Sequence, residues 1–208
     1  MDTTHDHRRA NLTTGADHKG VNRPLELLDE NEIRLLDEAM RTSHRTVLGY
    51  RNRLAVRLMA GAGLRISEVL SLTPASIDPM TGNIRVTGKG GKTRITRLPA
   101  ADMPLLRSWI KRRPDGATML VCRQDGSPME ASAMRQTIKR AAARAGIRKE
   151  VRCHSFRHRF AVTLANDNVP VPHISRLLGH SSVATTQHYL AGLSLEDALD
   201  ALTERVTV

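Results

Sequence analysis

The spacing of apolar residues is helical along most of this chain and changes to a strand pattern in one central stretch. Asn83 to Thr87 and Lys92 to Leu98 have the period of two that is typical of strands, and Gly88-Lys89-Gly90-Gly91 separates them. Two short strands joined by a glycine-rich turn predict an antiparallel hairpin. We therefore expect an α+β fold that is mostly helical and contains one small antiparallel β-sheet.

Helical segments are predicted on both sides of this hairpin. The first begins where Asp29 is followed three residues later by Glu32, because each side chain can accept a hydrogen bond from the other residue's backbone N–H. Further helices are expected to end at Gly61-Ala62-Gly63, before Pro74 and at Gly146. The segments lie at about 29–40, 54–63, 64–72, 103–110 and 128–146, and the last third adds 154–166, 171–178 and 181–190. The apolar faces that mark them contain Ile33, Leu36, Met40, Leu54, Ala55, Leu58, Met59, Ala62, Leu106, Trp109, Ile110, Met134, Ile138, Ala141 and Ala145.

The domain organisation follows from the polar N-terminus. Residues 1–23 lack periodicity, which is typical of a disordered tail, and the histidines in this tail are expected to be solvated rather than metal-binding. Residues 24–208 are expected to form one domain that ends in an amphipathic helix at 194–205. Neither a signal-peptide core nor an apolar run of membrane-spanning length is visible, so we expect a soluble, cytoplasmic, nucleoid-associated protein. Cys122 and Cys153 are too few to predict a disulfide framework.

Positive charge dominates the composition and is concentrated in two blocks. The chain has 32 Lys and Arg residues against 21 Asp and Glu residues, and its net charge is +11 at pH 7. Residues 85–113 and 135–159 each contain nine basic residues and one acidic residue. Such blocks favour a polyanionic partner such as a nucleic acid over a uniformly basic and solvated surface. The candidate DNA contacts are Lys92, Arg94, Arg97, Arg135 and Lys139.

Five short motifs carry cationic or reactive residues, and each also has an ordinary structural explanation. Arg65 and Glu68 lie one helical turn apart, so a buried salt bridge explains them equally well. Lys89 in the hairpin turn could be a solvated turn residue, and a tyrosine such as Tyr189 is by default a half-buried packing residue. The other residues of these motifs are His154 and Arg157 at i and i+3, His158 beside them, and His180 after a helix stop.

Taken together, these residues meet the chemical requirements of phosphodiester transfer without a metal. Two arginines can clamp the non-bridging phosphate oxygens, because their guanidinium groups form bidentate hydrogen bonds and stay protonated. A tyrosine can attack phosphorus and form a covalent intermediate, a histidine can accept its proton, and a lysine can protonate the leaving oxygen. The sequence has no closely spaced carboxylates that would hold Mg²⁺, so we expect neither a metal nor another cofactor.

In order and spacing, these residues resemble the catalytic set of the tyrosine recombinase, or phage integrase, family. The matching positions are Arg65, Lys89, His154-x-x-Arg157, His180 and Tyr189, and the successive gaps Arg65–Lys89, Arg157–His180 and His180–Tyr189 are 24, 23 and 9 residues. Flanking segments such as G-L-R-I-S-E-V-L, G-K-G-G-K-T-R and L-L-G-H-S-S-V-A-T-T-Q-H-Y carry the same resemblance. It extends from about residue 24 to the C-terminus. The resemblance implies the DNA breaking-rejoining fold and a site-specific recombinase or integrase that acts through a 3′-phosphotyrosyl intermediate.

The resemblance also implies a role for each matching residue. Arg65 and Arg157 would clamp the scissile phosphate with His180 as a third donor, Lys89 would protonate the 5′-hydroxyl leaving group, and Tyr189 would be the nucleophile. His154 would assist proton transfer at the tyrosine, while Glu68 and His158 would orient the cationic residues. The partner that the resemblance implies is double-stranded DNA. The expected assembly on it is a homotetramer, with a further recombinase or an architectural DNA-binding protein as an accessory partner.

The chain departs from typical members of that family at its N-terminus. Typical members carry a separate helical domain that closes around DNA, whereas about 25 mostly polar residues precede the catalytic region here. In this respect the chain resembles short, catalytic-domain-only members such as the fimbrial phase-switch invertases; a truncated longer protein is the alternative. The C-terminal helix either caps its own domain or docks onto a neighbouring subunit. Two other functions stay open: a non-catalytic DNA-binding regulator and a type IB topoisomerase-like enzyme.

Overall fold

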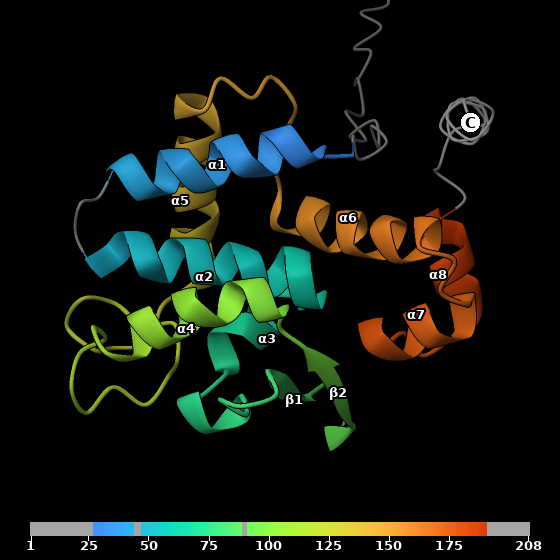
Figure 1. The fold of residues 1–208 in the computed structure, drawn as a ribbon, viewed down its shortest axis with the longest axis horizontal. Helices are drawn as coiled ribbons and strands as arrows, with labels where there is room; N and C mark the ends of the chain where they lie inside the picture. Colours follow the sequence, from blue (N-terminus) through green and yellow to red (C-terminus); the bar gives the residue numbers. More distant parts are fainter. Residues whose placement is uncertain (1–26, 44–46, 89–90, 191–208) are drawn as a thin grey trace, which may run out of the picture.

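The structure of the protein is a computed structural model that describes residues 27–43, 47–88 and 91–190, without the side chains at positions 42, 43, 188 and 189. The expected tail at 1–23, the expected helix at 194–205 and Lys89 lie outside the described residues. Helix α2 (Val47–Ala62) runs through the middle of the molecule, with α1 (Glu30–Ser43) along one side and α4 (Met103–Ile110) along the other (Figure 1). The predicted class, mostly helical with one small antiparallel sheet, is confirmed.

Helix α1 begins where the sequence predicts it. The backbone N–H of Asp29 donates to Glu32 Oε2 at 2.9 Å, and the backbone N–H of Glu32 donates to Asp29 Oδ1 at 2.7 Å. These reciprocal bonds satisfy backbone donors that the first helical turn leaves without a partner. The face that follows packs against α2 and α5 (Ala131–Arg144), and it buries Ile33, Leu36 and Met40.

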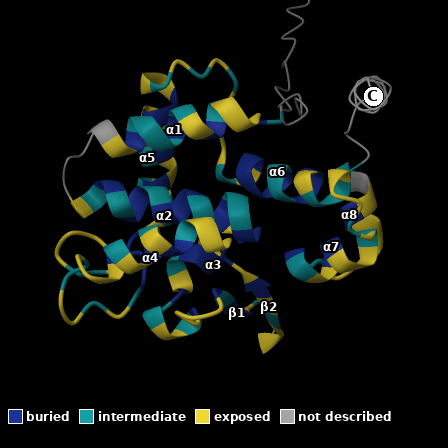
Figure 2. Ribbon diagram, in the orientation of Figure 1, coloured by how far each residue is buried: buried dark blue, intermediate teal, exposed yellow. Residues whose placement is uncertain are grey.

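Helix α2 is the centre of the main hydrophobic core. It contacts α1, α4 and α6 (Cys153–Asn166), and its predicted apolar stripe is completely buried (Figure 2). Even Arg51 and Asn52 are buried here, because the Arg51 guanidinium donates to Asn52 Oδ1 and to the backbone carbonyl of Cys122. With 16 residues it is the longest helix that the structure describes, and none of the described helices is long and apolar enough to cross a lipid bilayer.

The predicted hairpin is present as β1 (Asn83–Thr87) and β2 (Thr93–Arg97), which pair antiparallel with Asn83 opposite Arg97. Ile84 and Val86 point into the core, as the alternation predicts. The opposite strand turns Thr96 inward, and its hydroxyl donates to the carbonyl of Ala62 at 2.9 Å. The base of the hairpin is therefore attached to the end of α2.

Three short segments and two further helices complete the fold. Helix α3 (Ile66–Ser71) follows α2, the 3₁₀ turns η1 (Pro74–Ser76) and η3 (Ala100–Asp102) flank the hairpin, and α6 leads to α7 (Val171–Leu178) and α8 (Val183–Leu190). A second, smaller cluster of Ala161, Ile174 and Leu178 packs α6 against α7. Two residues of the predicted apolar faces are not buried: Ile110, in the last turn of α4, is 38% exposed, and Ala145, directly after α5, is only partly buried.

Candidate active site

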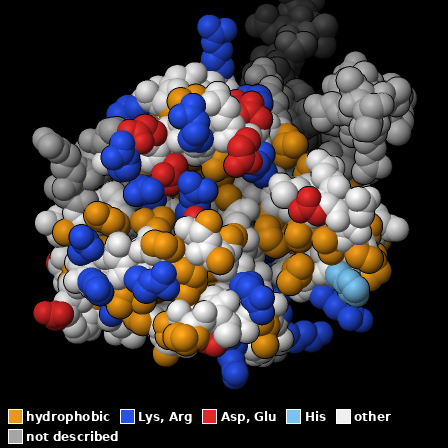
Figure 3. Space-filling model, in the orientation of Figure 1, with side chains coloured by type: hydrophobic (Ala, Val, Ile, Leu, Met, Phe, Trp, Pro, Cys, Tyr) orange, Lys and Arg blue, Asp and Glu red, His pale blue; other side chains and the backbone are white. Residues whose placement is uncertain are grey.

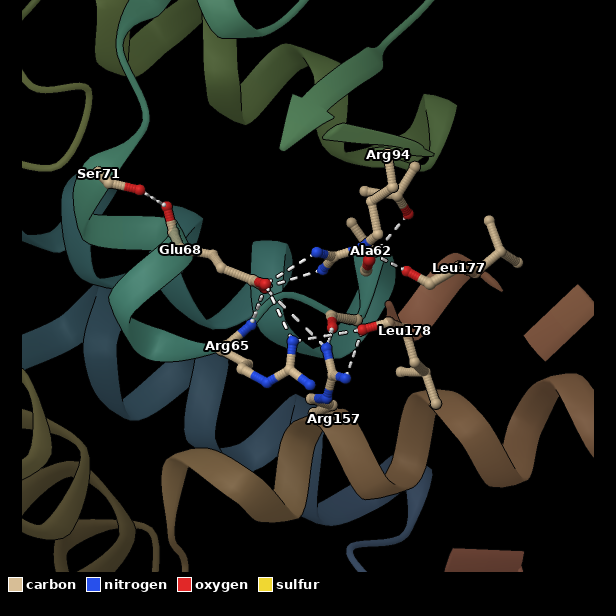
Figure 4. Close-up of polar contacts among 10 residues, drawn as sticks. Ala62, Arg65, Glu68, Ser71, Arg94, Arg157, Leu177 and Leu178 are labelled. Carbon is tan, nitrogen blue, oxygen red and sulfur yellow. Dashed lines mark hydrogen bonds and ion pairs between the residues drawn. The ribbon is translucent and has the colours of Figure 1, made fainter. Parts of the chain in front are cut away.

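The site is built where three segments that are distant in the sequence meet. Arg65 immediately precedes α3, Arg157 lies in α6, and the turn after α7 carries His180 (Figure 4 shows the first two). The backbone N–H of Arg65 donates to Glu68 Oε2 at 2.7 Å, and Arg65 Nη1 donates to Glu68 Oε1 at 3.1 Å. Glu68 therefore fixes both the start of α3 and the direction of the Arg65 side chain.

The carbonyl of Leu178 joins the two arginines. It accepts hydrogen bonds from Arg157 Nη2 at 2.6 Å and from Arg65 Nη1 at 3.4 Å, as Figure 4 shows. This carbonyl is available because α7 ends here: Gly179 adopts φ +63°, a left-handed conformation that glycine tolerates and that closes a helix. The negative end of the α7 dipole thus lies among the positively charged groups of the site.

The two arginines differ in their exposure. The Arg157 side chain is 1% exposed, and its Nη1 also donates to the carbonyl of Gly63 at 2.5 Å. The Arg65 side chain is 42% exposed and lines a cavity of about 890 Å³ beside the cluster. The exposed guanidinium is the one that a phosphate in this cavity would meet first, whereas Arg157 supplies positive charge from within the protein.

Glu68 lies in the centre of three arginines. Its side chain is 6% exposed, it accepts hydrogen bonds from Arg65 and Arg94, and Arg157 Nη1 is 4.0 Å from its Oε2. Burial by itself would raise the pKa of Glu68, but the hydrogen bonds from Arg94 and from the Arg65 backbone hold that pKa at about 2. The carboxylate is therefore ionised at neutral pH.

His180 is held in a neutral form beside these arginines. Its ring Nδ1 lies 2.8 Å from the hydroxyl oxygen of Thr186, a completely buried residue of α8. Burial of the ring, together with the charges of Arg157 and Arg65, lowers the pKa of His180 to about 4. At neutral pH the ring is therefore an uncharged hydrogen-bonding group that also lines the cavity.

The two histidines of α6 are also kept neutral. His154, in the first turn, is exposed, and partial desolvation of its ring and the charge of Arg157 lower its pKa. His158, which is buried, has its pKa lowered by burial alone. A neutral imidazole can accept a proton, so both rings are in the form that a base requires.

The nucleophile and the acid of the predicted set are only partly located. Tyr189 lies in α8, three residues after Thr186, but its side chain is outside the described residues. Lys89 is likewise outside them, although Thr87 and Gly88, which directly precede it, line the same cavity as Arg65 and His180. The described residues thus bring together Arg65, Glu68, Arg157 and His180.

The predicted DNA contacts fall into two groups. Lys92 and Arg97 are exposed on the hairpin, and Lys92 also lines the cavity. Figure 3 shows basic side chains at the surface around the strands and α7. Arg135 and Lys139 are exposed four residues apart on α5, and the charge of Arg135 acts on Cys153 at the start of α6, next to His154.

Arg94 is placed differently from those basic residues. Its side chain is only 12% exposed, and its guanidinium donates to both carboxylate oxygens of Glu68. Arg94 also lines the cavity, so its predicted contact with DNA stays a prediction, but its guanidinium is already occupied by Glu68. The alternation of side chains along a strand could have predicted this position. Arg94 lies two residues before the inward-facing Thr96, so both side chains are on the inner face of β2.

Comparison with known proteins gives a consistent result. The profile of the Phage integrase family matches residues 26–194. Tyrosine recombinase XerD of Corynebacterium glutamicum is 35% identical over 168 residues, which cover 78% of this chain and 55% of that protein. Tyrosine recombinase XerC of Alcanivorax borkumensis is 33% identical over 168 residues, covering 78% and 54%. The chain thus spans about half the length of these curated relatives.

Solved structures share the fold. The XerA recombinase superposes with a TM-score of 0.76 at 26% sequence identity, covering 88% of this chain and 66% of that one. The XerH site-specific recombinase, bound to difH substrate in a pre-cleavage complex, gives a TM-score of 0.69 at 28% identity, covering 79% and 50%. The family profile, the relatives and the arginine–histidine cluster agree. The chain belongs to the phage integrase family of tyrosine recombinases.

Proposed function

We propose that this protein is a site-specific DNA recombinase that cleaves and rejoins DNA through a 3′-phosphotyrosyl link to Tyr189. The observation that carries the proposal is the convergence of Arg65, Arg157 and His180 on the end of α7, beside a cavity lined by exposed polar groups. The names of the relatives, tyrosine recombinases XerC and XerD, support the same activity.

The reaction is a transesterification in each direction. In cleavage, the phenolic oxygen of Tyr189 attacks phosphorus, a new P–O bond forms, and the bond to the 5′-oxygen breaks. Lys89 gives a proton to the departing 5′-hydroxyl, and His154 accepts the phenolic proton. Rejoining reverses these steps with a 5′-hydroxyl as the nucleophile. Since the phosphotyrosyl link conserves the energy of the phosphodiester bond, no nucleotide triphosphate is consumed.

The electrostatics of the site suit this chemistry. Negative charge grows on the non-bridging oxygens in the transition state, and the positive charges of Arg65 and Arg157 stabilise it. His180, neutral at physiological pH, adds a hydrogen bond without adding charge. Glu68 and His158 hold the neighbouring groups in place.

DNA binding and assembly complete the proposal. Lys92, Arg97, Arg135 and Lys139 contact the phosphate backbone, since exposed basic residues release counterions on binding. The XerH relative was solved on its difH substrate. We further propose that four copies act together on DNA, with a second recombinase or an architectural protein as accessory.

A covalent trap tests the activity. A pool of nicked DNA duplexes with randomised flanks is incubated with the protein, so that a short fragment diffuses away after cleavage and the adduct persists. The wild-type protein is expected to form a denaturant-resistant protein–DNA adduct, and Tyr189→Phe is expected to form none. An adduct with Tyr189→Phe would refute the assignment of the nucleophile. Binding without any adduct would indicate a DNA-binding regulator, and relaxation of plasmids of arbitrary sequence a topoisomerase.

A further inference from the structure

Arg94 uses every nitrogen of its guanidinium inside the protein. Nη1 and Nη2 donate to the two carboxylate oxygens of Glu68, each at 2.8 Å, and Nε donates to the backbone carbonyl of Leu177, also at 2.8 Å (Figure 4). The two parallel bonds to Glu68 form the bidentate arrangement that only a guanidinium can make with a carboxylate. Arg94 is therefore fixed in direction as well as in position.

The packing around Arg94 is equally close. A methyl group at Gly179, the residue directly before His180, would lie 3.0 Å from Arg94 Cδ and Nη1. The aliphatic part and the guanidinium thus lie against the backbone of the turn that carries His180. Arg94 lines the cavity with only the 12% of its side chain that is exposed, and its three guanidinium nitrogens are already hydrogen-bonded within the protein.

These contacts connect three parts of the site through one side chain. Arg94 belongs to β2, the strand that leaves the turn containing Lys89, and β2 is itself attached to α2 by the hydrogen bond of Thr96. Its bonds to Glu68 reach the start of α3, and its bond to Leu177 reaches the end of α7. Through these bonds, Arg94 fixes the positions of the hairpin, Glu68 and the turn that carries His180 relative to one another.

The charge of Arg94 has a further consequence for Arg65. Glu68 binds both arginines, so Arg94 takes up a large part of the carboxylate's charge. Without Arg94, the buried carboxylate would pair more closely with Arg65 and reduce the positive charge that Arg65 presents to the cavity. Arg65 would then be a weaker partner for a phosphate although no catalytic group had been removed.

We propose that Arg94 is a positioning residue for strand transfer: it shares Glu68 with Arg65, fixes the His180 turn through the Leu177 carbonyl, and does not contact DNA. The inference rests on the proposed recombinase activity. It assigns to this strand residue an effect on the rate of cleavage rather than on DNA affinity.

The experiment compares Arg94→Gln and Arg94→Lys with Arg97→Gln, an exposed arginine of the same strand. Arg94→Gln is expected to lower the single-turnover cleavage rate on the order of 10- to 100-fold, because small displacements at a reacting phosphate have effects of this size. Its DNA dissociation constant is expected to change less than about twofold, the difference expected from a residue that makes no phosphate contact. Arg97→Gln should instead lower the affinity for DNA and make that affinity less dependent on salt concentration. Arg94→Lys keeps the positive charge beside Glu68 but cannot form the bidentate pair, so its rate should lie between those of wild type and Arg94→Gln; it serves if Arg94→Gln does not fold.

A double variant separates shared charge from simple packing. Because Arg94 acts partly through Glu68, replacing Arg94 in a Glu68→Gln background should lower the cleavage rate by a smaller factor than replacing it in the wild-type protein. An unchanged rate in folded Arg94→Gln, or a loss of affinity equal to the loss of rate, would overturn the proposal. So would a loss of rate in the Arg94→Gln/Glu68→Gln double variant that equals the product of the losses in the two single variants.

A readout without DNA distinguishes this proposal from the proposed function. The ¹⁵N resonances of the His180 ring report its titration, and removing the charge of Arg94 should raise the pKa of His180, whereas Arg97→Gln should leave it unchanged. If wild-type protein forms no adduct, the recombinase assignment fails, and this titration alone decides the placement of Arg94. An unshifted His180 titration in Arg94→Gln would show that Arg94 does not control the His180 turn.

Discussion

Replacing Glu68 with glutamine should destabilise the protein far more than the loss of an ordinary surface charge. The side chain keeps its shape and one acceptor oxygen, but three arginines lose their shared counter-charge. Removing one partner of a buried ion pair costs about 3–5 kcal/mol, and the retained acceptor favours the lower end, about 3 kcal/mol. For a chain of this size that corresponds to a melting temperature lower by roughly 6–12 °C.

Urea unfolding followed by circular dichroism at several pH values measures this effect. The folded-state pKa of Glu68, about 2, lies below its usual value of 4.5, so its contribution is complete above pH 4.5 and is lost as the pH falls toward 2. Glutamine does not titrate. The difference in unfolding free energy between wild type and Glu68→Gln should therefore be constant near neutrality and smaller at pH 3.

A matched control is Glu130→Gln. Glu130 pairs with Arg123 at 3.4 Å, but its side chain is 70% exposed, and exposed pairs contribute about 0–1 kcal/mol. The reasoning is refuted if the two variants lose similar stability at pH 7, or if the loss in Glu68→Gln is the same at pH 7 and pH 3.

Two further substitutions test the backbone and the histidine of the site. Gly63 has φ +69°, and a Cβ there would lie 2.4 Å from Phe160 Cδ1, so Gly63→Ala should lower the unfolding free energy by about 2–4 kcal/mol in urea titrations. Gly116→Ala, with φ +73° and open space, should lose only about 1 kcal/mol; equal losses would contradict the packing argument. Thr186→Val removes the hydroxyl beside His180 and should slow single-turnover cleavage roughly 5- to 30-fold, whereas Thr186→Ser should stay close to wild type. Equal rates for the valine and serine variants would show that the hydroxyl is not needed.

Local patterns predicted the secondary structure well because each pattern depends on interactions between near neighbours. The Asp29–Glu32 pair specified the start of α1 through hydrogen bonds three residues apart. The alternation in residues 83–97 specified the hairpin and its buried face. Ile110 was misplaced because the end of an amphipathic helix can extend past the core that it covers, and spacing alone does not reveal where that core ends.

The sequence predicted which residues form the candidate site, but not which of them are buried and which are exposed to a ligand. Motif spacing identified Arg65, Arg157 and His180, which the structure brings together. It did not reveal that Arg157 is buried and Arg65 exposed, because burial depends on how α6 packs against α2. The hydrogen bonds of Arg94 were also not predictable from local patterns, because their acceptors are a carboxylate 26 residues away and a carbonyl 83 residues away.

The hydrogen bonds at the end of α7 limit which insertions and deletions the chain can tolerate. Consecutive carbonyls there serve different arginines, Leu177 binding Arg94 and Leu178 binding Arg65 and Arg157. Adding or deleting one residue within α7 would rotate everything after it by about 100° and shift it by about 1.5 Å, so each carbonyl would miss its arginine. The length of α7 is therefore constrained as strictly as the identity of any side chain in the site.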